Sequence, residues 1–201
     1  VFGAIDHFRS GSLHQTLRAA FPHSRLIGCS TAGEITPDGV EDGSCSVTAV
    51  HFDATGLVEA STRLTGMDDS YAAGERLGQQ LAAVDLKAVL VFGPGVKING
   101  SALVNGISSI IGNAVPITGG LAGDAGAFKQ TFTLGSGGVT DDQVVAIGLC
   151  GEQLRFGHGS FGGWEPFGPA RKVTRCDGNV LYELDGEPVL RTVGGEGPKS
   201  Y

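Results

Sequence analysis

A run of small residues ending in a carboxylate occupies Ile27–Ile35, with the sequence IGCSTAGEI. Ser30 could act as a nucleophile, the small residues could cradle a phosphate, and Glu34 could hold an amine or a hydroxyl donor. Glu34 could equally cap backbone N–H groups of its own loop. A second segment of the same character, ITGGLAGDA at Ile117–Ala125, narrows the choice. These segments are called the first loop and the second loop below.

Ser30 matches a nucleophile elbow only in part. Gly28 stands two residues before it, but Ala32 stands where the second glycine should be. A catalytic serine also needs a histidine base, and when the two loops are aligned Ser30 falls on Gly120. A hydrolase that uses Ser30 is therefore a second alternative. No triad pattern surrounds the five histidines, which are His7, His14, His23, His51 and His158.

Phosphate binding is disfavoured by the acidic residues of the two loops. Neither loop contains the GxxxxGK[ST] pattern, and Glu34 and Asp124 would repel a phosphate. Carboxylates at matched positions suit an ammonium or hydroxyl group better. The alternative, that one or both acids cap their loops, stays open.

The composition and net charge limit the classes of protein to which this chain can belong. The chain has 201 residues with 41% hydrophobic residues and a net charge of −7, which is typical of a globular domain and argues against a nucleic-acid surface. No apolar run approaches the roughly 20 residues of a membrane span. The four cysteines form no CxxC pair, so we expect reduced, mostly buried thiols in a cytoplasmic protein and no metal site.

An internal repeat relates the two loops. When Val1 is set against Val91, apolar, small and acidic positions coincide without a gap as far as Glu34, which falls on Asp124. The pattern predicts a duplication of residues 1–64 and 88–161. The repeat has a helix before its second copy, and the matching helix of the first copy would precede Val1. The repeat therefore predicts a helix before Val1.

Each copy predicts a strand, a helix, a strand ending in the loop, and further strands. Helices are expected within 12–21 and 101–111, with Ser12 and Ser101 near their starts. A third helix is expected over 68–84, with residues 68–70 as its cap and Val84 on its apolar face. The order predicts an α+β fold of two pseudo-symmetric β-α-β-β halves, an αββα-like sandwich with helices on mixed sheets. The further strands are expected at 46–52, 56–64, 129–134, 144–150 and 154–161, and a hairpin around 173–181.

Four separated elements resemble the FIST domain family. They are RLIGCSTAGEI, GGLAGD, the Trp-x-Pro-x-Gly pattern that begins at Trp164, and the terminal ELDGEPVL. The resemblance covers residues 1–190 as a FIST N-terminal sensory domain and leaves the tail 191–201 unassigned. The family's N-terminal helix and its C-terminal companion domain are not part of the resemblance.

The resemblance implies a bacterial, cytoplasmic sensory domain that is not an enzyme. It implies a small ligand, usually proposed to be an amino acid, and a signalling partner such as a histidine kinase, a chemoreceptor or a cyclic-dinucleotide enzyme. No cofactor is expected, but some members are described as haem-based nitric oxide sensors, so a haem sensor is the first alternative, with His158 as its candidate axial ligand.

A zwitterionic amino acid would suit the two loops. Backbone N–H groups could hold its carboxylate, and Glu34 or Asp124 could hold its ammonium group. Trp164, in a Gly/Pro-rich segment, could lie nearby. The predicted ligand-binding residues are therefore Ser30, Thr31, Gly33, Glu34, Gly119, Gly120, Asp124 and Trp164.

Overall fold

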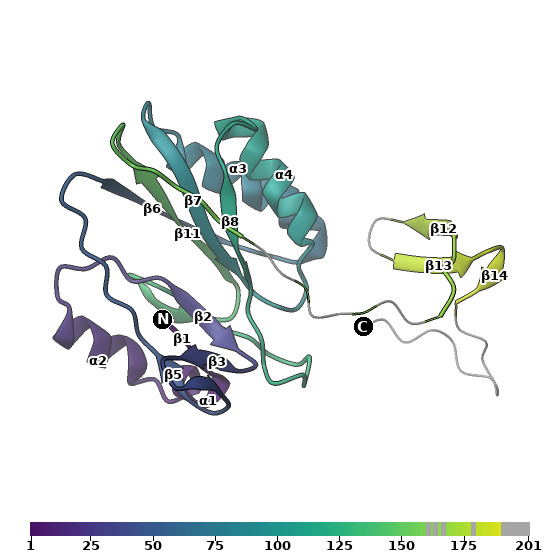
Figure 1. The fold of residues 1–201 in the computed structure, drawn as a ribbon, viewed down its shortest axis with the longest axis horizontal. Helices are drawn as coiled ribbons and strands as arrows, with labels where there is room; N and C mark the ends of the chain where they lie inside the picture. The colour runs from purple at the N-terminus through teal and green to yellow at the C-terminus, as the bar shows by residue number, and fades with distance from the viewer. Residues whose placement is uncertain (160–161, 163–164, 166–167, 178–179, 190–201) are drawn as a thin grey trace. The chain divides into compact units, whose positions relative to one another are not determined.

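Two units make up the chain in this computed structural model, Val1–His158 and Gly159–Tyr201. The structure describes residues 1–159, 162, 165, 168–177 and 180–189. Figure 1 shows the chain from its N-terminus in purple to its C-terminal strands in yellow.

The first sheet is built around a parallel pair of strands from the start of the chain. β1 (Phe2–Ala4) runs parallel to β2 (Gly28–Thr31), and α1 (Ile5–Arg9) and α2 (Leu13–Ala20) lie between them in sequence. Strands from later in the chain complete this sheet in the order β10-β9-β2-β1-β5. These added strands are β5 (Cys45–Ser46), β9 (Thr133–Gly135) and β10 (Gly138–Thr140).

The second sheet repeats the strand–helix–strand unit. β7 (Leu86–Gly93) runs parallel to β8 (Ile117–Leu121), with α4 (Gly100–Ile111) between them in sequence. β11 (Gln143–Cys150) and β6 (Gly56–Arg63) extend this sheet antiparallel, in the order β6-β11-β7-β8. β8 therefore forms one edge of the sheet.

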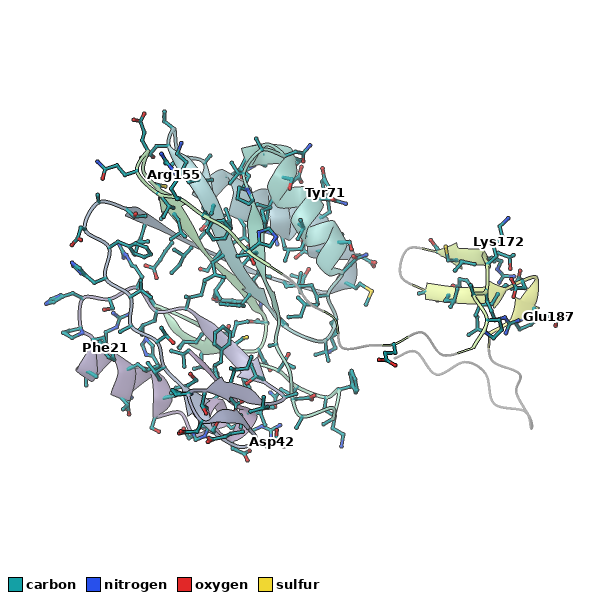
Figure 2. The ribbon with its side chains drawn as sticks, viewed as in Figure 1. Phe21, Asp42, Tyr71, Arg155, Lys172 and Glu187 are labelled. Carbon is teal, nitrogen blue, oxygen red and sulfur yellow. The ribbon has the colours of Figure 1, made fainter. Side chains whose placement is uncertain are left out.

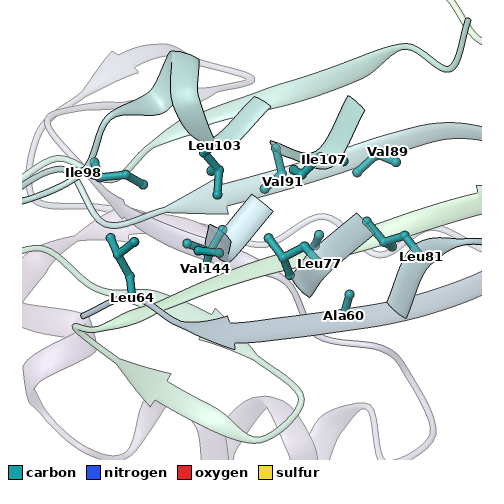
Figure 3. Close-up of a cluster of buried hydrophobic side chains, with 12 residues drawn as sticks. Ala60, Leu64, Leu77, Leu81, Val89, Val91, Ile98, Leu103, Ile107 and Val144 are labelled. Carbon is teal, nitrogen blue, oxygen red and sulfur yellow. The ribbon is translucent and has the colours of Figure 1, made fainter. Parts of the chain in front are cut away.

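Helices α3 (Ser70–Leu81) and α4 cover one face of the second sheet (Figure 1), and α3 follows the short 3-10 helix η1 (Met67–Asp69). Leu77, Leu81 and Ile107 are fully buried between helices and sheet (Figure 3). Burial of each such side chain contributes about 1.5–3 kcal/mol. This apolar face is the pattern that predicted the helices.

Two glycines bring α3 and α4 close together. A Cβ at Gly74 would lie 2.2 Å from the carbonyl oxygen of Leu103, and a Cβ at Gly106 would lie 2.1 Å from that of Tyr71. Neither position can carry a side chain unless a helix moves. The two helices therefore form one tightly packed layer.

The two sheets face each other across a small apolar cluster. Cys29 of the first sheet packs with Phe92 and Val145 of the second, together with Ala122. Phe2 meets Phe92 edge to face, with ring centroids 5.3 Å apart. Because helices lie outside both sheets, the layers are helix, sheet, sheet and helix, and the predicted α+β sandwich is confirmed. The superposition of the two halves stays a prediction.

Two smaller β elements form sheets of their own. β3 (Glu34–Thr36) and β4 (Gly39–Glu41) form a hairpin that begins at the end of the first loop. In the second unit, β12 (Val173–Asp177) and β13 (Val180–Leu184) pair antiparallel, as predicted, and β14 (Glu187–Pro188) follows.

Several predicted boundaries are wrong. The strand expected at 46–52 ends at Ser46, because β5 pairs only with the three-residue β1, and the apolar residues after it are exposed. The strand expected at 129–134 begins at Thr133, since the preceding residues wrap around Asp124. Residues 154–159 form no strand, and residues 160–161 lie outside the described part. Val84 is fully exposed, because α3 ends at Leu81.

The predicted cap positions of α2 and α3 are confirmed, but no side-chain capping hydrogen bond forms at either. Ser12 is the N-cap residue of α2 and Asp69 that of α3. The N-cap of α4 is Asn99 rather than Ser101, and its side chain accepts a hydrogen bond from the N–H of Ala102 at 3.0 Å.

Candidate functional site

Ser30 lies where the first and second loops meet. Its side chain is fully buried at the end of β2, and its hydroxyl donates to the carbonyl of Gly123 at 2.8 Å. The same hydroxyl accepts from the N–H of Phe132 at 2.9 Å. The N–H of Gly123 donates to the carbonyl of Ser30 at 2.7 Å. The loops that the sequence paired are therefore brought together, and Ser30 joins them.

Glu34 is buried and hydrogen-bonded by its own segment. One carboxylate oxygen accepts from the hydroxyl of Thr31, and the other accepts from the N–H of Ser44 at 3.0 Å and from its hydroxyl at 2.7 Å. Burial raises the pKa of Glu34, but these hydrogen bonds outweigh it and hold the pKa below its ordinary value. The carboxylate thus closes the base of hairpin β3–β4.

Asp124 has the matching position in the second loop and a similar environment. Its carboxylate accepts from the N–H groups of Phe128, Lys129 and Gln130 at 2.9, 2.8 and 3.2 Å. The N–H of Lys129, with the others, holds the pKa of Asp124 below its ordinary value against the effect of burial. Asp124 therefore orders the segment that leads to β9.

Hydrolytic chemistry finds no support at Ser30. Both hydrogen-bond partners of its hydroxyl are backbone groups, whereas a serine nucleophile needs a side-chain base. Among the described residues, no three His, Cys, Asp or Glu side chains lie close enough to hold a metal ion.

A groove with apolar walls lies along β8. Gly119 and Gly120 line it together with His158, and its volume is about 320 Å³. A Cβ added at Gly120 would meet no atom within 4 Å, so the missing side chain leaves open space there. We call this the β8 groove; its apolar walls are Val91, Leu103, Val104, Ile117 and Leu121.

The edge of β8 keeps free backbone groups beside the groove. In the part of the chain that the structure describes, no strand pairs with the outer side of β8. Gly119 has φ +144°, and a Cβ there would lie 1.8 Å from the carbonyl oxygen of Val91. Only glycine fits this conformation and this close approach.

The remaining predicted residues are distributed over other places. Thr31 binds Glu34, and Gly33 has φ +131°. A Cβ at Gly33 would lie 3.1 Å from the carboxylate of Asp42, which is labelled in Figure 2. Trp164 lies outside the described residues. The structure thus places Gly119 and Gly120 in the β8 groove and Ser30, Glu34 and Asp124 in buried hydrogen-bond networks.

The apolar wall of the groove was not predicted as part of a site. Leu103 and Val104 were interpreted only as part of a helix that covers a sheet. A signal was present, because the segment SALVNGISSII has apolar residues on more than one helix face. In the structure Leu103 is buried while Val104 is 39% exposed.

Comparison with known proteins shows the family. The chain matches the FIST N domain over residues 1–187. The chain belongs to the FIST family. FIST domains are sensory domains of signal transduction. The resemblance found in the four sequence elements is thereby confirmed.

One relative of this FIST domain is the uncharacterized protein MJ1623 of Methanocaldococcus jannaschii. It is 40% identical over 81 residues, which are 38% of this chain and 15% of the relative. The match therefore spans about a seventh of the relative's length. No helix in the described residues of this FIST domain is both long and apolar enough to cross a membrane.

The β8 groove does not fit a haem. His158 offers one imidazole ligand, but among the described residues no arginine or lysine lines the groove to meet the two propionates. Its volume also lies at the lower end of the range for small-molecule sites, about 300–1,000 Å³.

Proposed function

We propose that this FIST domain senses a small apolar amino acid, or a similar metabolite, by binding it in the β8 groove. The observation that carries the proposal is the groove itself, where Gly120 leaves open space beside a strand edge that no described strand pairs with. Small-molecule sites are mostly apolar hollows with a few convergent polar groups, and the β8 groove has this character.

Each part of an amino acid has a matching group in the groove. Carbonyl oxygens on the free edge of β8 accept from the ammonium group, and N–H groups of that edge or the imidazole of His158 donate to the carboxylate. The side chain lies against Leu103 and Ile117. Burial contributes about 0.8 kcal/mol per CH₂ group, so the groove favours leucine, isoleucine and valine over smaller or charged amino acids.

Glu34 and Asp124 take a supporting role in this proposal. Each carboxylate already accepts hydrogen bonds from its own segment. To hold a ligand ammonium group, either acid would need to share or lose these bonds, and buried donors left without a partner cost about 1–3 kcal/mol. The two acids order the loops, and Ser30 joins them.

The signalling output is proposed from membership of the FIST family alone. A sensory domain passes its ligand state to a signalling partner, and we propose a histidine kinase, a chemoreceptor or a cyclic-dinucleotide enzyme in the cytoplasm. The cysteines support a reducing compartment, because all four are free thiols.

Calorimetric titration tests the ligand and the groove together. The panel is leucine, isoleucine, valine, alanine, aspartate and lysine, applied to the wild type, Gly120→Val and Gly137→Val. Gly137 is the matched control, because a Cβ there also meets no atom within 4 Å and it does not line the groove. We expect an apolar amino acid to bind, and Gly120→Val to weaken binding by at least about tenfold, or about 1.4 kcal/mol.

The acids are tested in the same titration. Glu34→Gln and Asp124→Asn should leave the affinity nearly unchanged. If either acid paired with the ligand ammonium group, its loss would cost about 2–5 kcal/mol of binding. Such a loss, or equal affinity in Gly120→Val and Gly137→Val, would overturn the β8 groove as the site.

A further inference from the structure

Two hairpins of this chain have the same internal structure. In hairpin β3–β4 the pairs are Glu34 with Glu41, Ile35 with Val40 and Thr36 with Gly39. In hairpin β9–β10 they are Thr133 with Thr140, Leu134 with Val139 and Gly135 with Gly138. Gly39 and Gly138 both have φ +133°. Hairpin β3–β4 begins at Glu34 of the first loop, and hairpin β9–β10 follows the second loop, so we treat the two hairpins as counterparts.

Their apolar residues have opposite surroundings. Leu134 is fully buried, in a cluster with Phe8, Leu17 and Leu26, and Val139 packs against that cluster. The counterparts of these two residues, Ile35 and Val40, are 83% and 78% exposed. A hairpin that exposes both apolar residues of one pair lacks the partner that its counterpart has.

The partner of hairpin β9–β10 is the edge of β2. Gly28 and Cys29 pair with Leu134 and Thr133 across that edge. β8 has the equivalent place in the second sheet, since each of β2 and β8 follows a helix and runs parallel to the strand before it. The outer edge of β8 is unpaired among the described residues, and the β8 groove lies beside it.

The chain cannot dock hairpin β3–β4 on its own β8 in the same way. Residues 125–132 connect Asp124 to β9 and let that hairpin cross to the first sheet. The first hairpin has no such connector, because Glu34 is itself the first residue of β3. Its carboxylate also ties the hairpin base to Thr31 and Ser44. A second copy of the chain has no such restriction.

We infer that hairpin β3–β4 of one copy docks on the β8 groove of a second copy. β3 adds to the edge of β8 as β9 adds to β2, and Ile35 and Val40 enter the groove. The charges are complementary. The hairpin exposes Asp38 and Glu41, whereas Gly100, which lines the groove, lies at the positive end of a helix that has no acidic residue in its first turn.

Self-association through the β8 groove would be coupled to ligand sensing. The proposed ligand and the hairpin occupy the same groove, so binding of one excludes the other. This link rests on the proposed function, whereas the self-association itself does not. An apolar amino acid would therefore release the hairpin and separate the copies, which is a change that a signalling partner can detect.

Sedimentation velocity over a wide range of protein concentration tests the contact without ligand. The hairpin variant is Ile35→Ser/Val40→Ser, the groove variant is Gly120→Val, and the control is Val84→Ser, an exposed apolar residue outside both surfaces. We expect the wild type and the control to associate and to dissociate on dilution, and each of the two variants to stay monomeric. Circular dichroism checks that every variant is folded.

Mixing the two defective variants is the sharpest form of the test. The groove variant keeps an intact hairpin and the hairpin variant keeps an intact groove, so an equimolar mixture should form a heterodimer through one contact. A wild type that stays monomeric, a groove variant that associates as the wild type does, or a mixture that stays monomeric would overturn the proposal. Leucine is then added to the wild type. If the copies remain associated when leucine is added, the result contradicts the proposed ligand site but not the contact between the copies.

Discussion

Hairpins β3–β4 and β9–β10 follow matched acidic loops and share one register, but only the second packs on a sheet. Glu34 and Asp124 are both buried and both order the segment that follows them. Yet Ile35 is 83% exposed and Leu134 is fully buried. The difference lies in the connector, residues 125–132, which precedes hairpin β9–β10 and has no equivalent before hairpin β3–β4. A local pattern therefore sets the form of a hairpin, while the connector decides which sheet edge it reaches.

The largest expected effect concerns the matching apolar residues of the two hairpins, Leu134 and Ile35, of which only Leu134 is buried. Leu134→Ala removes a fully buried side chain and should lower the free energy of unfolding by about 2–5 kcal/mol. Ile35→Ala changes an exposed side chain and should change it by at most about 0.5 kcal/mol. Urea denaturation of both variants at a protein concentration that keeps them monomeric measures the difference. Equal losses would show that the two hairpins are packed alike.

The two acids should differ in a second, smaller way. Asp124 accepts from three backbone N–H groups, which cannot reorient, so the amide in Asp124→Asn leaves at least one of them unsatisfied. We expect a loss of about 1–3 kcal/mol in the free energy of unfolding. Two of the donors to Glu34 are hydroxyl groups, which can rotate, so Glu34→Gln should cost less, about 1 kcal/mol. Thermal or urea unfolding that gives the opposite order would contradict these roles.

Acid titration of stability is the third comparison. The pKa values of Glu34 and Asp124 are lowered by folding. Their contributions are complete above the unfolded pKa values, about 4.3 and about 3.9, and are lost as the pH falls through the folded values. The wild type should therefore lose stability below about pH 4. The double variant Glu34→Gln/Asp124→Asn should lose less over this range, and an unchanged slope would count against both hydrogen-bond networks.

Asp69 provides an internal reference for that titration. The hydrogen bond from Arg76 holds its pKa at about 2. Its contribution should persist in the double variant and be lost as the pH falls from about 3.9 toward the folded pKa. The residual acid dependence of the double variant should therefore shrink when Asp69→Asn is added.

The smallest expected effect concerns the alkylation rates of cysteines in the two sheets. Cys29 lies in β2 and Cys150 in β11, and both are buried, whereas Cys176 is exposed. Burial raises the pKa of the Cys29 thiol to about 11, and the thiolate is the reactive form. Alkylation followed by mass spectrometry should label Cys176 first and Cys29 and Cys150 only on opening of their sheets. Early labelling of Cys29 would show that the first sheet opens readily.

Much of the fold could be predicted because its signals are local. The apolar runs at β7 and β11 and the helical periodicity of α3 and α4 depend on neighbouring residues only. The pairing of β9 with β2 joins segments more distant in sequence, and no local pattern encodes it. The hairpin β3–β4 was missed although Pro37-Asp38-Gly39 is a turn signal.

The candidate site was predictable only in part for a similar reason. The sequence predicted that the two loops meet, and hydrogen bonds between Ser30 and Gly123 join them. It also singled out Gly119 and Gly120, because small residues mark places where a backbone is approached closely. Whether a carboxylate meets a ligand or its own loop depends on where nearby N–H groups point. Sequence left both alternatives open for Glu34 and Asp124, and the hydrogen bonds of Ser44 and Lys129 were not visible in it.

Hydrogen exchange is the most direct test of the claim that the β8 groove is the sensory surface. Amide exchange is followed by mass spectrometry with and without leucine, at a concentration at which the protein is monomeric. The account predicts slower exchange at Ile117–Leu121 on addition of leucine, with residues 31–34 and 124–130 unchanged. Protection of 31–34 or 124–130 while Ile117–Leu121 exchanges as before would contradict it and would assign the ligand to the acidic loops.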